Sequence, residues 1–135
     1  MKKLIYDAEN AIVGRMGTVV AKELLRGNEV IIINAEKAII TGNRQFIIAK
    51  VKKLRKKGGS STRGPIISKM PDRLLKRMIR GMLPWDRPKG REAWRRLTCY
   101  VGNGELKEAD LKNVIKFEHG QPFKFTTIKE ITDLL

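Results

Sequence analysis

The sequence is poor in the side chains from which catalytic and metal sites are usually built. Its 135 residues include one cysteine, Cys99, and one histidine, His119, with a turn-rich segment between them. A single cysteine cannot form an internal disulfide framework, which fits a reducing, intracellular setting. These two residues cannot supply the four ligands of a zinc site, and their separation does not favour a nucleophile pair. Because the carboxylates are also scattered, we expect no catalytic residue, no metal and no cofactor.

Long hydrophobic runs are missing as well. No apolar run approaches the roughly 18 residues that a membrane span needs. Acidic residues interrupt the N-terminal segment too early for a signal peptide. We therefore expect a cytoplasmic protein with no membrane partner. The length suffices for one domain with a real core but not comfortably for two, so residues 1–135 are predicted to form a single domain.

Acidic residues are scarce in the middle of the chain, where basic residues are dense. The whole sequence carries 29 Lys and Arg against 14 Asp and Glu, a net charge of +15. Residues 50–96 alone carry 17 basic and 3 acidic side chains, so nearly all of the excess lies there. About half of these cations are arginines, which suit two-point contacts with phosphate. This distribution predicts a polyanion-binding surface on an otherwise ordinary fold.

Hydrophobic periodicity near the N-terminus predicts a strand, a helix and a second strand. Residues 4–7 read as a short strand, and residues 13–25 place apolar side chains at helical spacing. Residues 30–33 are β-branched and apolar on both faces, which is typical of a central parallel strand. The three elements form a βαβ unit and predict an α/β fold.

A second helix is predicted to follow Asn43, whose side chain can cap it. We expect this helix to end in a run of cations and to turn its apolar side chains inward. The expected inward side chains are Phe46, Ile47, Val51 and Leu54. The polar, glycine-rich segment 58–65 that follows predicts a loop.

Segment 71–83 has the clearest helical pattern. Pro71 and Asp72 suit the first turn of a helix, and Gly81 and Pro84 bring it to an end. At about 100° per residue the side chains separate into an apolar half and a narrow basic arc. The apolar half holds Leu74, Leu75, Met78, Ile79, Met82 and Leu83, and the basic arc holds Arg73, Lys76, Arg77 and Arg80.

Two tryptophans flank the next basic loop, residues 85–90. Trp94 is expected to pack in the core, whereas Trp85 can either pack or stack on a base. Residues 91–96 are predicted to form one or two helical turns before a strand at 97–101. A capping box at 127–130 predicts a short final helix that turns Ile128, Ile131 and Leu135 inward.

The turn at Gly14 leaves an alternative open. It follows a strand and opens a helix, as a phosphate loop would, but it matches neither phosphate-binding glycine motif. We favour a packing role, in which Gly14 permits the helix to begin and Gly17 lets the helix lie close to the sheet. A nucleotide-binding α/β enzyme using this turn, or an architectural DNA-binding protein, are the alternatives.

Short blocks along residues 4–102 resemble the large-subunit ribosomal protein L13 family. The most specific block is Arg-Gly-Met-Leu-Pro at 80–84, in order with the others. The blocks lie at 7–10, 13–15, 34–37, 40–43, 64–65, 71–73, 79–84 and 97–102. The early first strand and the Gly-Gly-Ser-Ser segment at 58–61 are similar to the archaeal branch. Residues 103–135 match the family motifs poorly.

The resemblance implies a three-layer α/β/α sandwich on a four-stranded, mostly parallel sheet, with basic loop and helix extensions. It also implies a structural, non-enzymatic constituent of the large ribosomal subunit that binds large-subunit (23S-type) ribosomal RNA and joins assembly early. The implied partners are this RNA and neighbouring large-subunit proteins, with no small-molecule substrate and a cytoplasmic, ribosomal location.

The residues predicted to contact RNA combine the family blocks with the cations of the central region. They are Arg15, Thr41, Asn43, Arg44, Lys52, Lys53, Arg55, Lys56, Lys57, Arg63, Lys69, Arg73, Lys76, Arg77, Arg80, Arg87, Lys89, Arg91 and Arg95.

Overall fold

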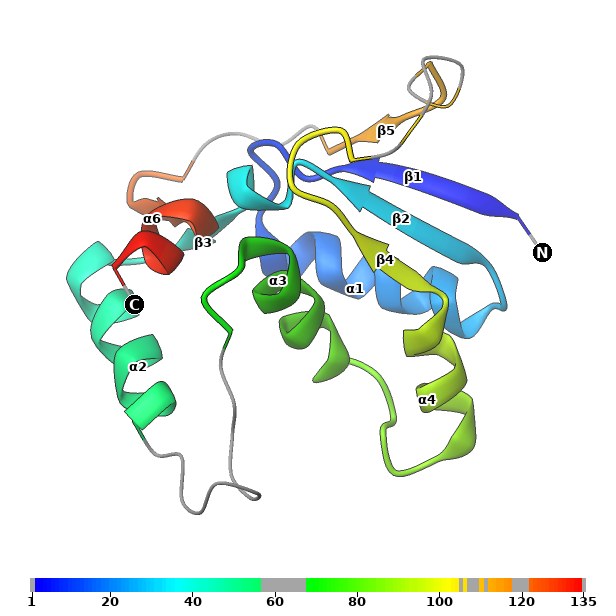
Figure 1. The fold of residues 1–135 in the computed structure, drawn as a ribbon, viewed down its shortest axis with the longest axis horizontal. Coiled ribbons are helices and arrows are strands. Elements are labelled where there is room, and N and C mark those ends of the chain that lie inside the picture. The colour runs from blue at the N-terminus through cyan, green and yellow to red at the C-terminus, as the bar shows by residue number, and fades with distance from the viewer. Residues whose placement is uncertain are drawn as a thin grey trace.

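A parallel sheet of β-branched and aliphatic residues lies at the centre of the computed structural model, which describes residues 2–56, 68–104, 106, 110, 112–117 and 122–134. Strands β1 (Lys3–Asp7) and β2 (Glu29–Ile33) pair in parallel, and helix α1 (Val13–Leu25) joins them. Strand β4 (Leu97–Cys99) pairs with β2, and strand β5 (Ile115–Lys116) pairs with β1, both in parallel. The order is β4-β2-β1-β5 (Figure 1), so the predicted strand–helix–strand unit is confirmed.

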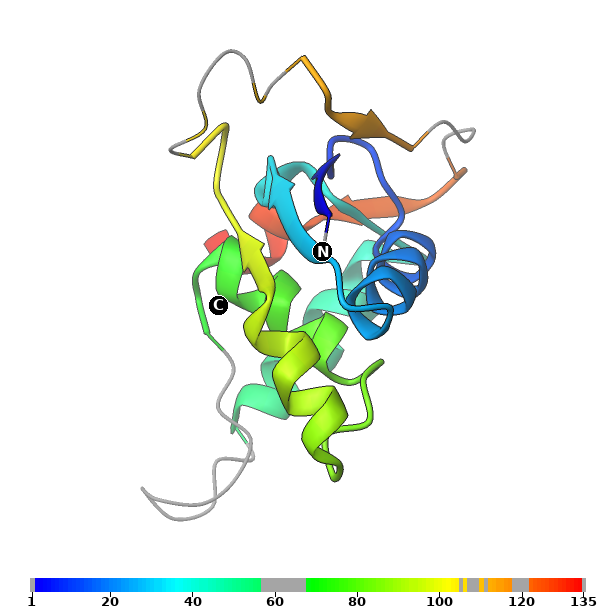
Figure 2. The ribbon, with the colours of Figure 1, turned by 90° about the vertical axis from the view of Figure 1, so that its right-hand side faces the viewer.

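The two faces of this sheet are covered differently. Helices α1, α3 (Pro71–Arg80) and α4 (Pro88–Arg95) lie against one face (Figure 2), where Ile32 packs with Met16 and Leu75 in the main core. The other face carries Ile5, Ile31 and Ile33, which pack with Tyr100, Leu106 and Val114. Alternate residues of a strand point to opposite faces, which explains this division. The predicted α/β class with a four-stranded parallel sheet is confirmed, and the arrangement is consistent with three layers.

A smaller antiparallel sheet lies beside α2. Strand β3 (Ile39–Thr41) pairs with β6 (Phe125–Thr127), and a short 3-10 helix, η1 (Ala35–Lys37), leads into β3. Helix α6 (Ile128–Asp133) follows β6 directly. The hydroxyl of Thr127 accepts a hydrogen bond from the Glu130 backbone N–H at 3.3 Å, which confirms the predicted helix start. Leu135, expected to point inward, lies outside the described residues.

Helix α2 (Arg44–Lys56) buries fewer of its side chains than predicted. Its start is confirmed, because the Asn43 side chain accepts a hydrogen bond from the Gln45 backbone N–H at 3.0 Å. Among its residues only Ile47 is buried. The expectation that Phe46 and Leu54 point into a core is wrong, because they remain 69% and 37% exposed. The helix lies at one side of the structure (Figure 1). No described layer covers the face of the helix that carries Phe46 and Leu54.

Helix α3 ends earlier than predicted, at Arg80 instead of Leu83. Beyond it the chain continues in tight turns, in which the Met82 N–H donates to the Ile79 carbonyl at 2.9 Å. Leu83 is buried, but Met82 is on the surface. Helix α4 begins inside the segment predicted as a loop, because Pro88 can start a helix without losing a hydrogen bond.

Two glycines allow helices to approach neighbouring segments closely. A Cβ atom on Gly90 of α4 would lie 2.1 Å from the Pro84 carbonyl oxygen, so this approach requires glycine. A Cβ atom on Gly17 would lie 2.6 Å from the sulfur of Met82. The expectation that Gly17 brings α1 near the sheet is therefore corrected, since its close neighbour is the segment after α3.

Candidate nucleic-acid interface

The four cations of α3 converge on one surface. Arg73, Lys76, Arg77 and Arg80 line a hollow of about 380 Å³ together with Ser68 and Trp94, which we call the α3 hollow. The opposite side of the helix buries Leu74, Leu75 and Ile79. The helical spacing predicted from the sequence therefore puts Leu74, Leu75 and Ile79 on the core and the basic arc on the opposite side of the helix.

Two tryptophans hold cations of α3 in place. The Lys76 Nζ lies 4.3 Å from the centre of the Trp94 ring, and the Arg80 Cζ lies 3.8 Å from the centre of the Trp85 ring. The two rings meet edge to face, with centres 5.3 Å apart. A cation over an aromatic face is attracted by the ring, so both side chains lose freedom before any ligand arrives.

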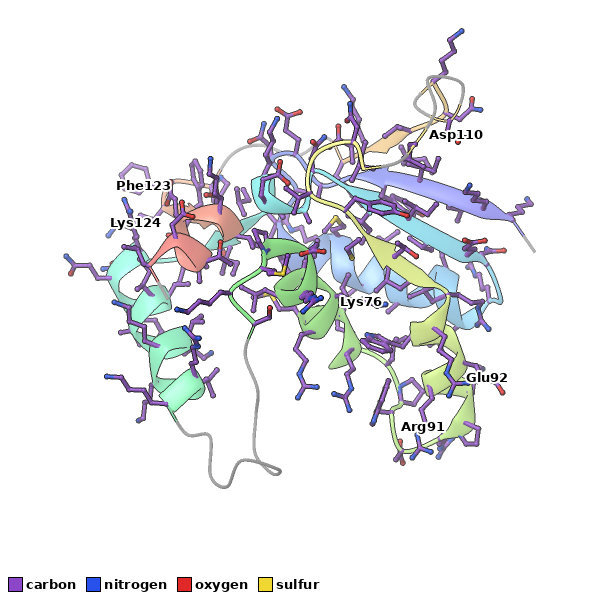
Figure 3. The ribbon with its side chains drawn as sticks, in the orientation of Figure 1. Lys76, Arg91, Glu92, Asp110, Phe123 and Lys124 are labelled. Atoms are coloured by element: carbon purple, nitrogen blue, oxygen red, sulfur yellow. The ribbon has the colours of Figure 1, made fainter. Side chains whose placement is uncertain are left out.

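Each tryptophan packs against other side chains in this structure. Trp94 packs against the main core, as predicted, and its Nε1 donates to the Lys76 carbonyl at 3.4 Å. Trp85, for which the sequence allows either packing or base stacking, has Arg80 over its ring. Figure 3 shows Lys76 projecting from α3 on the side of α4, in line with its contact with Trp94.

The α3 hollow continues into a second, smaller one. Arg77 and Arg80 also line a hollow of about 340 Å³ with Gly81, Leu83 and Trp85. Its neighbour Arg91, on α4, donates from Nε to the Trp85 carbonyl at 3.0 Å. The segment between α3 and α4 is thus held by an arginine as well as by ring contacts.

Among the described residues, no carboxylate lines either hollow. Asp72, in the first turn of α3, has a buried Oδ1 without a hydrogen-bond partner in the described part of the chain.

Burial raises the pKa of the Cys99 thiol to about 12, while Lys76 lowers it and Asp72 raises it further. Because the thiolate is the reactive form, Cys99 stays protonated and unreactive near neutral pH.

The other predicted RNA-binding residues form a looser set. Lys69, Arg87, Lys89 and Arg95 are exposed beside α3 and along α4, and Arg15 is exposed on α1. On the α2 side, Thr41, Asn43, Arg44, Lys52, Lys53 and Lys56 are exposed, and Arg55 is half-buried. Arg44 lies 3.8 Å from a carboxylate oxygen of Glu130. Lys57 and Arg63 lie outside the described residues.

The set of RNA-binding residues predicted from the sequence lacks some residues of these surfaces. Ser68 lines the α3 hollow, and Lys124 lines a small hollow with Asn43 and Arg44. Lys50 is exposed on α2 and belongs to the cation run that the sequence already showed. Ser68 and Lys124 carried no signal, because only the folded chain brings them beside the cations. Arg96 has a structural contact instead, since its Nη2 donates to the Leu24 carbonyl at the end of α1 at 2.6 Å.

Among the described residues, no group of three or more histidine, cysteine, aspartate or glutamate side chains could hold a metal ion. None of the helices in the described part of the chain is long and apolar enough to cross a membrane.

The fold and these surfaces define a small, strongly basic α/β protein with cations gathered on α3 and α4 and along α2. The family model described as "Ribosomal protein L13" matches residues 1–105. The chain belongs to this family of structural, non-enzymatic ribosomal proteins.

Curated archaeal relatives agree with the family match. The large ribosomal subunit protein uL13 of Methanocaldococcus jannaschii is 43% identical over 95% of this chain and 93% of its own length. The protein of the same name from Methanosarcina barkeri is 48% identical over 78% of this chain and 76% of its own. The one from Archaeoglobus fulgidus is 35% identical over 97% of this chain and 86% of its own. The resemblance to the L13 family, including its archaeal character, is therefore confirmed.

Proposed function

We propose that the chain is a constituent of the large ribosomal subunit that binds large-subunit ribosomal RNA, with the α3 hollow as the centre of the contact. The observation that carries this proposal is the convergence of Arg73, Lys76, Arg77 and Arg80 on one hollow, which no carboxylate of the described residues lines. A polyphosphate backbone is the ligand chemistry that such a surface fits.

The arrangement suits phosphate contacts physically. Each phosphate that a Lys or Arg neutralises releases a counterion, so the affinity depends on the number of contacts and on salt. Arginine also offers a planar fork of donors that matches two phosphate oxygens. Because Trp94 and Trp85 already restrain Lys76 and Arg80, less side-chain freedom is lost on binding.

The cations of α4 and α2 extend this contact. Arg87, Lys89, Arg91 and Arg95 would engage the RNA next to the hollow, and the exposed lysines of α2 would meet a separate stretch of backbone. The proposed set also includes Arg15, Thr41, Asn43, Arg44, Arg55 and Lys69, together with Lys57 and Arg63 outside the described residues. Contacts of this kind position the protein by phosphate, sugar and shape instead of by base sequence.

The test compares charge reversal inside and outside the hollow. The double variant Arg73→Glu/Arg77→Glu changes two exposed side chains of α3, and Lys22→Glu/Lys129→Glu changes two exposed cations elsewhere by the same net charge. Binding of the full chain to a large-subunit RNA fragment is measured across a salt series. We expect the α3 variant to reduce the slope of log affinity against log salt by about 1.5, since each phosphate contact contributes about 0.7–0.9.

Two outcomes would contradict the proposal. Equal losses in the two variants would mean that only overall charge attracts RNA. Equal affinity for RNA and for duplex DNA of the same length, at fixed salt, would favour the architectural DNA-binding alternative. The nucleotide-dependent enzyme is disfavoured by membership of a non-enzymatic family.

The family resemblance also supports an early place in subunit assembly and contacts with neighbouring large-subunit proteins on cytoplasmic ribosomes. Binding of the isolated protein to protein-free ribosomal RNA would support early entry. A requirement for another large-subunit protein would contradict it.

A further inference from the structure

An apolar groove lies on the opposite side of α3 from the cations. It has a volume of about 670 Å³ and lies between α2, the start of α1, β3 and the end of α3. Phe46, Val51 and Leu54 contribute from α2, and Met78 and Met82 from α3 and the turn after it. The α3 hollow shares no lining residue with this groove, so the two surfaces are separate.

The apolar side chains of the groove are unusually open to solvent. Phe46 is 69% exposed, and Leu54 and Met82 are each 37% exposed. The positions 46, 47, 51 and 54 follow helical spacing, so they form one stripe along about 12 Å of α2. An open apolar stripe beside charged residues is typical of an interaction surface.

The charged residue that lines the groove is a cation of α2. Helix α2 carries six cations and no acidic residue, and Lys50 itself lines the groove. The three ion pairs found among the described side chains leave Lys50, Lys52 and Lys53 unused. An occupant that presents carboxylates beside its apolar side chains would therefore complement this surface.

We propose that the groove binds a segment of a protein partner that is amphipathic and acidic, with apolar side chains at helical spacing and a carboxylate that meets Lys50. RNA suits the groove poorly, because a phosphate placed among apolar side chains would lose hydration without gaining hydrogen bonds. A second copy of this chain suits it poorly as well, because two α2 surfaces of like charge would repel each other. This inference goes beyond RNA binding, and it does not depend on the α3 hollow.

The test uses two synthetic peptides of about 14 residues with leucines at i, i+3, i+4 and i+7. One has glutamates on its flanks, and the other has lysines in their place. Fluorescence anisotropy measures their binding to the full chain and to the variant Phe46→Gln/Leu54→Gln, which removes apolar surface without changing charge. The control is Val19→Gln, an exposed apolar residue of α1 that does not line the groove.

We expect the glutamate peptide to bind the wild-type chain at least about tenfold more tightly than the lysine peptide. The affinity for the glutamate peptide should fall about tenfold in the groove variant and stay unchanged in Val19→Gln. Binding of the RNA fragment should remain within about twofold in both variants, so a failure here is distinguishable from a failure of the RNA proposal.

Several results would overturn the inference. Equal binding of the two peptides, or an unchanged affinity in the groove variant, would show that the groove does not select this chemistry. Loss of RNA binding in Phe46→Gln/Leu54→Gln would assign the groove to RNA instead. Self-association of the wild-type chain in sedimentation that disappears in the groove variant would assign the groove to a second copy.

Discussion

Helices α2 and α3 carry comparable densities of positive charge, yet they are built into the protein in different ways. Helix α2 has six cations among 13 residues, and α3 has four among 10. Helix α3 buries Leu74, Leu75 and Ile79, whereas α2 buries only Ile47. Charge density alone therefore does not distinguish a preformed surface from a solvated helix. Anchoring of the opposite face makes that distinction.

The surroundings of the cations differ in the same direction. On α3, Lys76 and Arg80 lie over tryptophan rings that are themselves in contact. On α2, Arg44 has a nearby carboxylate at 3.8 Å, and no ion pair or ring contact among the described residues involves the lysines. We infer that α3 presents Lys76 and Arg80 in a fixed arrangement, whereas the α2 lysines have no such restraint among the described residues.

The largest expected effect concerns the anchoring of the two helices. Leu75→Ala, in the fully buried part of α3, should destabilise the protein by about 3 kcal/mol through lost packing and a new cavity. Ile47→Ala should cost less, about 2 kcal/mol, because its surroundings open into the groove. Urea unfolding of both variants measures the difference. Equal losses would remove the contrast between the helices.

The next effect concerns the tight contact between α4 and the segment after α3. Gly90→Ala would place a Cβ atom 2.1 Å from the Pro84 carbonyl oxygen, and the backbone must shift to admit it. We expect a loss of about 2 kcal/mol in thermal unfolding. Gly14→Ala on α1 is the matched control, since its Cβ would meet nothing within 4 Å. A neutral Gly90→Ala would mean that this side of the domain is loosely packed.

The pH dependence of stability tests whether the Cys99 thiol stays buried and protonated in the folded protein. Burial raises the pKa of Cys99 to about 12 in the folded protein, whereas an unfolded thiol ionises near 8.5. The contribution of Cys99 to the free energy of unfolding is therefore complete below about pH 8.5. It is lost as the pH rises toward 12, by up to about 1.4 kcal/mol per pH unit. Cys99→Ala should show a shallower decline in stability. Parallel declines would contradict a buried, protonated thiol.

The smallest expected effect concerns the restraint of Lys76. Trp94→Leu removes the ring beneath this ammonium while keeping an apolar side chain, and should weaken RNA binding about fivefold, or about 1 kcal/mol. Phe46→Leu on α2 should leave RNA affinity unchanged, because none of the described cations lies over that ring. A similar loss in both variants would show that the tryptophan does not arrange the cation.

Local patterns predicted most of the fold. The β-branched run at 30–33 indicated a central parallel strand, and the structure places β2 between β1 and β4. The boundaries of α1 agree with the prediction at both ends. The faces of α3 followed from helical spacing, because a helix with one apolar half has one way to bury it.

The errors occurred where the outcome depends on distant parts of the chain. The apolar stripe of α2 has the same spacing as a core-facing stripe, but no described layer lies over Phe46 and Leu54. Gly17 fits against Met82, which lies far along the sequence. The pairing of each tryptophan with a cation of α3 was likewise invisible, because it needs the positions of α3 and α4 together.

The most direct test of the central claim measures entry into the ribosome. Tagged Arg73→Glu/Arg77→Glu, Lys22→Glu/Lys129→Glu and wild-type chains are each expressed beside the untagged chain, and their amounts in salt-washed large subunits are compared. We predict that the α3 variant enters at less than about one tenth of the wild-type level and that the control enters normally. Equal incorporation of the α3 variant and the wild type would contradict the assignment of the α3 hollow as the centre of RNA binding.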